Sequence, residues 1–162
     1  MKMFASSDCI ELVKRFEGCR LEAYQDAGGL WTIGYGHTKD VKQGDVIAQG
    51  QAEIFLECDL LAAAEAVNRL VTVGLLQCEF DALCDFVFNE GEKHFAESTL
   101  LRKVNSGEFI EAEQELMRWD FAHGEQLPGL RDRRIAERKL FSGIKNAELT
   151  TDSSNVTKQS AE

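Results

Sequence analysis

The chain has 162 residues, of which 44% are hydrophobic and 28% are charged, a balance typical of a folded domain and not of a disordered chain. With 28 acidic against 18 basic residues its formal net charge is -10, which argues against electrostatic binding to nucleic acid or to an anionic membrane. The longest apolar runs, such as 60–64, are too short for a transmembrane helix, and no apolar segment typical of a signal peptide follows Met1. We therefore expect that the protein does not insert into a membrane and that it accumulates in the cytoplasm.

The first 37 residues predict a short helix followed by a β-hairpin. Asp8 and Glu11 have the spacing of a capping box, an apolar stripe follows them, and Gly18 is placed to end the helix. Two extended runs, 21–25 and 30–37, then flank the turn sequence Asp-Ala-Gly-Gly, which favours a hairpin.

Most of the remaining chain predicts helices. Apolar residues recur along one side of a single long helix over 51–71, and further helices are expected over 77–89, 98–106, 110–122 and 130–141. Periodicity ends after Lys145, so residues 146–162 are expected to form a flexible tail. The prediction is a single α+β domain over 1–145, in which a small N-terminal lobe of about 1–50 and a mostly helical lobe of 72–145 are joined by the long helix, with a cleft between them.

The five cysteines and three histidines predict neither a disulfide framework nor a metal site. The cysteine count is odd and there is no C-x-x-C pair, so reduced thiols are expected, with Cys58 and Cys84 as small core residues on apolar helix faces. The histidines have no ligand spacing to one another or to a cysteine, so neither a metal nor another cofactor is implied.

Glu17 is the first candidate for chemistry. It lies four residues after Val13 and seven after Ile10, so it shares the apolar face of the first helix. It also lies in the last turn, where the helix dipole disfavours a negative charge. Both effects favour the protonated form that a general acid requires, although from position alone a solvated side chain at a frayed helix end is an equally good interpretation.

Asp26 and Thr32 are candidates on the predicted hairpin. An aspartate that opens a turn usually caps backbone amides, which is a structural role. In the run that follows, alternation places Thr32, Gly34 and Gly36 on one face, opposite Trp31, Ile33, Tyr35 and His37. A face with one hydroxyl and two glycines lets a bulky polar ligand approach the backbone, so an acid, a carboxylate and a hydroxyl would converge on a groove, as glycoside hydrolysis requires.

These residues also carry a resemblance to a known family. The run F-E-G-C-R-L-E-A-Y-Q-D-A-G-G-L-W-T-I-G-Y-G-H-T over 16–38 resembles the active-site signature of phage-type lysozymes, glycoside hydrolase family 24. Stretches within 86–102 and 118–137 agree with it, and the resemblance covers 8–143. It implies a lysozyme-like fold and a muramidase that cuts the β-1,4 bond between N-acetylmuramic acid and N-acetylglucosamine in peptidoglycan, causing lysis of the host cell.

The resemblance also implies roles for individual residues. Glu17 would protonate the leaving oxygen, and Asp26 and Thr32 would hold or activate the attacking water of an inverting reaction. Phe88 would line the sugar groove, and Asn89 and Thr99 are further candidates for substrate binding. Two supporting residues are implied as well: Arg131 as an arginine that packs near the glutamate, and His37 as a buried partner of an acid.

Partners and alternatives follow from the same reasoning. Peptidoglycan glycan strands are the expected partner of a monomer, which would need a holin to reach the cell wall. The basic cluster of 131–139 would supply any attraction to anionic wall polymers. A lytic transglycosylase is an alternative, against which Asp26 and Thr32 argue because that reaction uses no water. A non-catalytic peptidoglycan-binding module is another, against which the presence of Glu17 and Asp26 argues.

Overall fold

The computed structural model describes residues 2–122 and 124–143, so the predicted tail lies outside the described residues. In chain order the elements are α1 (Ser7–Glu17), β1 (Arg20–Gln25), β2 (Trp31–Gly34), α2 (Gln49–Leu70), α3 (Gln77–Glu90), α4 (Glu92–Glu97), α5 (Thr99–Asn105), α6 (Phe109–Leu116), β3 (Phe121–Ala122), β4 (Glu125–Gln126) and α7 (Pro128–Phe141).

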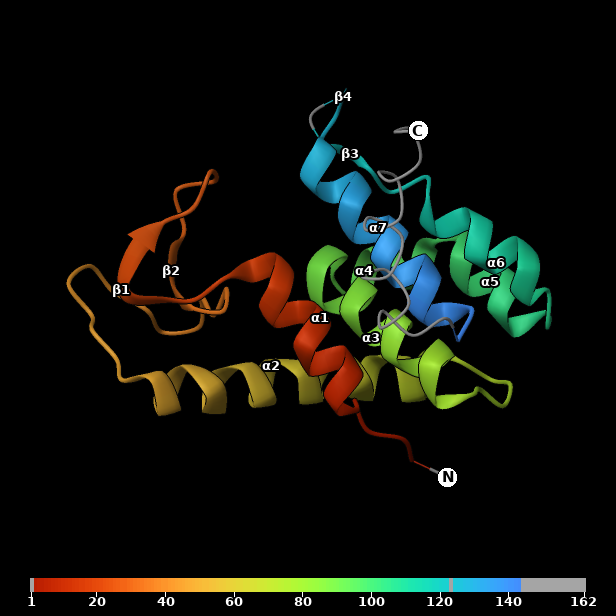
Figure 1. Cartoon of the computed structure of the whole chain (residues 1–162), viewed down its shortest axis with the longest axis horizontal. Helices are drawn as coiled ribbons and strands as arrows, with labels where there is room; N and C mark the ends of the chain where they lie inside the picture. Colours follow the sequence, from red (N-terminus) through yellow and green to blue (C-terminus); the bar gives the residue numbers. More distant parts are fainter. Residues whose placement is uncertain (1, 123, 144–162) are drawn as a thin grey trace, which may run out of the picture.

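The antiparallel β1–β2 hairpin lies at one end of the molecule and a group of helices at the other, while α2 runs along beneath both (Figure 1). At the centre of the helical lobe, α3 packs against α1, α2 and α7. Residues 80–87 of α3 are all buried, because a helix that is covered on every side by other elements has no solvent face. The predicted α+β architecture with a long connecting helix is confirmed.

Helix α1 precedes the hairpin in sequence but packs against α3 and α7. Its N-cap is Ser6, whose hydroxyl oxygen accepts a hydrogen bond from the Asp8 amide at 3.2 Å, so the predicted cap at Asp8 was wrong. The Ser6 hydroxyl in turn donates to the buried carboxylate of Asp81 on α3 at 2.5 Å, which ties the start of α1 to the helical lobe. Gly18 ends the helix with a φ of 65°, as predicted.

The second strand of the hairpin is shorter than predicted. It ends at Gly34, and Ile33 and His37 exchange two backbone hydrogen bonds of 2.9 Å across a tight turn. Gly34 and Gly36 have φ values of 64° and 92°, a left-handed conformation that a residue with a side chain rarely adopts. The predicted alternation of residues 31–37 along one extended strand was therefore wrong beyond Gly34.

Two other segments differ from their predicted elements. The helix expected over 110–122 ends at Leu116, and Phe121–Ala122 pairs with Glu125–Gln126 instead. Trp119 leaves the helix to pack edge-on against Phe86, with ring centroids 5.2 Å apart, so tertiary packing overrides helix propensity here. The short helix α4 between Gly91 and Ser98 was not predicted.

The register of α2 also differs from the predicted apolar stripe. Its buried side passes through Leu56, Leu60 and Ala63, whereas Cys58 is exposed, so the prediction that Cys58 is a core residue was wrong. Cys84 on α3 is buried as predicted. None of the helices in the described part of the chain combines the length and the apolar character that a membrane crossing requires.

Candidate active site

Glu17 is the last residue of α1, and an arginine from the far end of the sequence holds its carboxylate. Oε1 of Glu17 accepts a hydrogen bond of 2.5 Å from Nη1 of Arg133, and 23% of the Glu17 side chain remains exposed. The frayed, fully solvated helix end considered above is therefore wrong. Arg133 thus holds the carboxylate, while part of the Glu17 side chain stays open to solvent.

The arginine beside Glu17 is Arg133 and not Arg131, the residue that sequence matching selected. Arg131 is exposed, and its Nη1 lies 3.9 Å from Oδ2 of Asp120. Residues two apart on a helix point about 200° away from each other, so Arg131 faces outward when Arg133 faces α1. The error is one of alignment by two positions in an arginine-rich segment.

Buried charges surround Arg133. Burial alone would lower the pKa of Arg133, but the carboxylates of Asp85 and Glu17 raise it above its ordinary value, so the guanidinium is a permanent cation. Arg134 is completely buried as well, and its Nη2 donates to Glu137 at 2.6 Å. Burial raises the pKa of Glu137 well above its usual range, more than the Arg134 cation lowers it.

Asp26 is held by the hairpin turn that it opens. Its Oδ1 accepts hydrogen bonds from the backbone amides of Gly28 at 2.9 Å and Leu30 at 2.8 Å, and the residue is exposed. Thr32 on β2 is only 3% exposed, and its hydroxyl donates to the carbonyl of Leu30 at 3.0 Å. Leu30 thus connects the two side chains through its backbone.

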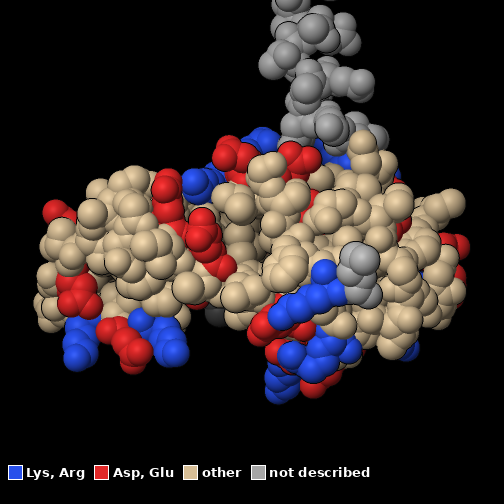
Figure 2. All heavy atoms as spheres, turned by 90° about the horizontal axis from the view of Figure 1, so that it is seen from below, with Lys and Arg blue, Asp and Glu red and all other residues tan. Residues whose placement is uncertain are grey.

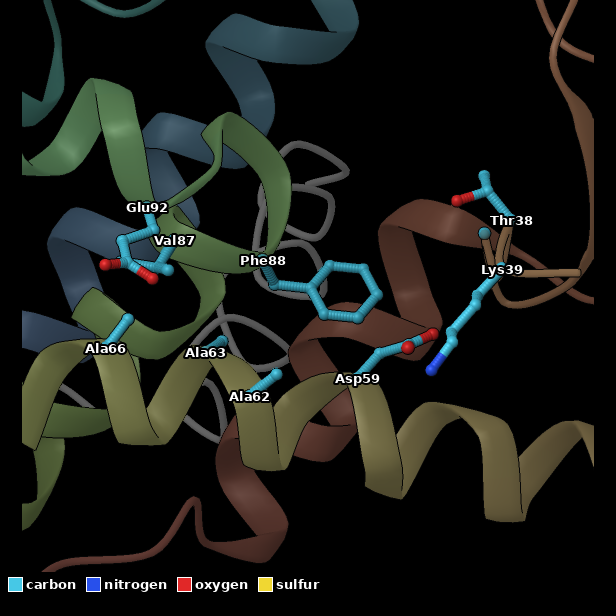
Figure 3. A pocket seen from close by; sticks show the side chains of 10 residues that line it. Thr38, Lys39, Asp59, Ala62, Ala63, Ala66, Val87, Phe88 and Glu92 are labelled. Carbon is cyan, nitrogen blue, oxygen red and sulfur yellow. The ribbon is translucent and has the colours of Figure 1, made fainter.

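The turn that follows β2 brings the small lobe against Glu17. A Cβ atom added to Gly36 would lie 3.2 Å from Oε2 of Glu17, so a larger residue there would push against the carboxylate. Gly36 also lines a cavity of about 320 Å³ that extends over α2. Figure 3 shows the Phe88 ring of α3 projecting into this space, with Ala62 and Asp59 of α2 below and Thr38 and Lys39 opposite.

Comparison with known proteins identifies the family to which this site belongs. The model of the phage lysozyme family matches residues 14–137. The chain belongs to the phage lysozyme family. The endolysin of Acyrthosiphon pisum secondary endosymbiont phage 1 is 46% identical over 143 residues, which cover 86% of this chain and 98% of that protein. The protein is thus a phage lysozyme, an endolysin-type glycoside hydrolase that degrades peptidoglycan for lysis of the host.

Two further matches bear on the fold and on the route to the cell wall. The solved structure of a mutant P22 lysozyme is 38% identical, with a TM-score of 0.78 over 86% of this chain and 99% of that one, so the predicted lysozyme-like fold is confirmed. The SAR-endolysin of Bacteriophage PS119 is 39% identical over 125 residues, which cover 76% of this chain and 75% of that protein.

The remaining predicted site residues of the lysozyme have different surroundings. Phe88 lines the cavity, but Asn89 and Thr99 are not among the described residues that line it. The side-chain oxygen of Asn89 accepts a hydrogen bond from Arg134 at 2.7 Å, and the hydroxyl of Thr99 accepts one from Arg102 at 2.6 Å. Both side chains are thus bonded to arginines of the helical lobe.

His37 packs as a structural residue in the phage lysozyme. Its Nδ1 lies 2.8 Å from Oδ2 of Asp59 on α2, and its ring stacks on Phe55 with centroids 4.2 Å apart. The His37–Asp59 pair thus attaches the turn that contains Gly36 to the long helix α2. Among the described residues there is no cluster of three or more His, Cys, Asp or Glu side chains with the geometry of a metal site.

Sequence reasoning missed Arg133 and Asp85 as components of this site. Asp85 gave one usable signal, because it is an acid inside the otherwise apolar run 82–88 of a helix. Gly36 was predicted to leave room for a ligand, but its position next to the Glu17 carboxylate was not predicted. Arg133 gave none, since five basic residues lie within 131–139 and only the rotation of α7 selects one of them.

Proposed function

We propose that this lysozyme hydrolyses the β-1,4 bond between N-acetylmuramic acid and N-acetylglucosamine with Glu17 as its general acid. The observation that carries the proposal is the position of the Glu17 carboxylate, which Arg133 holds at 2.5 Å beside Gly36, a residue of the cavity wall. A protonated Glu17 donates its proton to the leaving glycosidic oxygen. The carboxylate that remains is then stabilised by the Arg133 cation next to it.

Asp26 and Thr32 serve the attacking water in this proposal. Two backbone amides bond to Oδ1 of Asp26, while no described residue donates a hydrogen bond to its Oδ2, which is therefore able to accept a proton from water. The water attacks the anomeric carbon as the bond to the leaving oxygen breaks, and its proton passes to Asp26. This is the inverting pathway, in which one carboxyl acts as acid and the other as base.

The fragments released from purified peptidoglycan distinguish this proposal from its alternatives. Mass spectrometry of the products is expected to show reducing N-acetylmuramic acid ends that carry the mass of one added water. 1,6-Anhydro ends would indicate a lytic transglycosylase, and binding without release would indicate a non-catalytic module. The anomeric configuration of the first product, read by NMR before mutarotation, tests inversion separately.

We propose that a holin gives this lysozyme access to the cell wall. The support is the 46% identity to the endolysin of Acyrthosiphon pisum secondary endosymbiont phage 1, which is matched over 98% of its length. Expression of the chain in a Gram-negative host is expected to leave the cells intact until a holin or chloroform permeabilises the inner membrane. Lysis on membrane depolarisation alone, without a permeabilising agent, would contradict this route.

A further inference from the structure

The buried carboxylate of Asp85 bonds to the same arginine, Arg133, that contacts Glu17. Asp85 lies in the middle of α3 and has no solvent exposure. Its Oδ2 and Oδ1 accept hydrogen bonds from Nε and Nη2 of Arg133 at 2.9 and 3.0 Å. A two-bond pair of this kind fixes the plane of the guanidinium and directs the remaining Nη1 towards Glu17.

Other groups around Arg133 come from α1 and α7. On α7, Oε1 of Glu137 is 3.8 Å from Nε of Arg133 and is bonded more closely to Arg134 at 2.6 Å. On α1, the ring of Phe16 lies 5.8 Å from the guanidinium carbon. Asp85 therefore provides the only carboxylate other than Glu17 that bonds directly to Arg133 among the described residues.

Titratable groups from α7, α1 and α3 face Asp85. From α7, burial raises the pKa of Glu137, and the charge of Asp85 and a hydrogen bond between the two carboxyl groups raise it further, which favours a neutral Glu137. The thiol of Cys9 on α1 lies near Asp85, but burial raises its pKa and it stays neutral. From α3, burial likewise raises the pKa of the Cys84 thiol. The small lobe faces Glu17 with Gly36, which has no side chain.

We infer that Asp85 is a positioning residue for the proposed catalytic acid, which it serves by orienting Arg133 and by balancing the charge of that arginine. The inference rests on the proposed function of Glu17. An arginine cation beside a carboxyl group favours the ionised form, whereas a general acid must carry a proton. In a buried region the electrostatic attraction between the guanidinium and a carboxylate is strong, and a second carboxylate bonded to the same guanidinium weakens this attraction. Asp85 thus fixes the guanidinium that holds Glu17 and offsets its charge.

The test is the pH profile of kcat and KM for the full-length Asp85→Asn variant on soluble peptidoglycan fragments. Asparagine keeps the shape of the side chain and one acceptor oxygen but removes the charge. Glu17 then faces an unbalanced Arg133, so the alkaline limb of kcat is expected to move to lower pH by about one unit. At a pH on that limb kcat falls about tenfold, while KM stays near the wild-type value because no sugar contact is removed.

Asp81→Asn is the matched control. Asp81 lies one turn earlier on α3 and is 1% exposed, but its carboxylate bonds to Ser6 at the start of α1 instead of to an arginine. Both variants remove a buried charge from the same helix and are expected to lower the melting temperature. Only Asp85→Asn is expected to move the alkaline limb, and Asp85→Glu, which restores the charge, is expected to return the limb towards its wild-type position.

An unmoved alkaline limb in folded Asp85→Asn would overturn the inference and leave Asp85 a purely structural residue. If that variant does not fold, Asp85→Glu decides. Its charge keeps the alkaline limb in place, but its longer side chain displaces the guanidinium, so kcat at the pH plateau is expected to fall with KM unchanged, and a wild-type plateau kcat overturns the inference. Glu17→Gln separates the two proposals. If it stays active, the proposed function fails; if it is inactive while the Asp85 result is negative, only the present inference fails.

Discussion

The two carboxylates proposed for catalysis are held in opposite ways. Glu17 bonds to Arg133, which is 116 residues away in sequence and is itself fixed by a buried carboxylate of another helix. Asp26 is exposed, and the amides that hold it lie two and four residues further along its own turn. The position of Asp26 is thus a local property of the hairpin. The position of Glu17 exists only when α1, α3 and α7 are packed together.

The largest expected effect comes from Glu17→Gln. Loss of the proton donor is expected to lower turnover on purified peptidoglycan by about 10²–10⁴-fold or more. The fold should survive, because Arg133 keeps both bonds to Asp85. The measurement is the initial rate of fragment release from peptidoglycan by the wild type and by Glu17→Gln. Circular dichroism spectra of both proteins check the fold. Near wild-type turnover in a folded variant would rule out Glu17 as the acid.

Two substitutions at Asp26 separate catalysis from turn formation. Asn keeps an oxygen that accepts the amides of Gly28 and Leu30 but loses the charge, so activity is expected to fall about 10²-fold with little change in melting temperature. Ala removes both the accepting oxygen and the charge, so the Asp26→Ala variant should lose as much activity as Asp26→Asn and also about 1 kcal/mol of stability. Rates and thermal melts of the two variants are compared directly. Equal melting temperatures for Asn and Ala would show that the turn does not depend on the side chain.

The buried cluster behind Glu17 should leave a signature in the pH dependence of stability. Because the pKa of Glu137 is raised in the folded state, the folded protein binds the proton more tightly than the unfolded chain does. Its contribution to stability is therefore complete below the unfolded pKa of about 4.3 and is lost as pH rises towards the folded pKa, by up to about 1.4 kcal/mol per pH unit.

Glu137→Gln removes this titration. The free energy of unfolding of the wild type is expected to fall relative to that of the variant as pH rises above about 4.3, measured by urea denaturation at a series of pH values. Glu113→Gln serves as a control, since Glu113 pairs with Arg138 at 2.6 Å on a partly exposed surface. A difference between wild type and Glu137→Gln that is constant with pH would mean that Glu137 keeps its charge in the folded protein.

The smallest expected effect concerns salt. The predicted basic cluster of 131–139 is much weaker on the surface than in the sequence, because Arg133 and Arg134 are buried. Figure 2 shows acidic and basic side chains interspersed on the face that it presents. With a net charge of -10, the enzyme should be repelled by anionic wall polymers at long range.

Moderate salt should therefore not inhibit lysis. The Debye length falls from about 30 Å at 0.01 M to about 10 Å at 0.1 M, so the repulsion is screened before close contacts in the groove are affected. The initial lysis rate of chloroform-treated Gram-negative cells is expected to hold or rise between these ionic strengths at constant pH. A steep fall from the lowest salt would indicate that the exposed basic residues dominate binding.

Sequence by itself determined the elements whose cause is local. The helix that ends at Gly18, the long helix α2 and the turn opened by Asp26 all follow from residue spacing and from residues that favour caps or turns. The active-site signature also indicated the family of the chain. The signature contains Glu17, Asp26 and Thr32 within 16 consecutive residues of a single helix and hairpin, so neighbouring sequence was enough to find them.

Only the tertiary structure decided which side chains support that signature. The rotation of α7 decides that Arg133 and not Arg131 meets Glu17. The packing of α3 between three helices buries Asp85. The contact of Trp119 with Phe86 accounts for the end of the predicted helix at Leu116. Spacing along a chain fixes which residues share a face of one element. It does not fix what that face meets, because contacts between distant segments are set by the packing of the whole core.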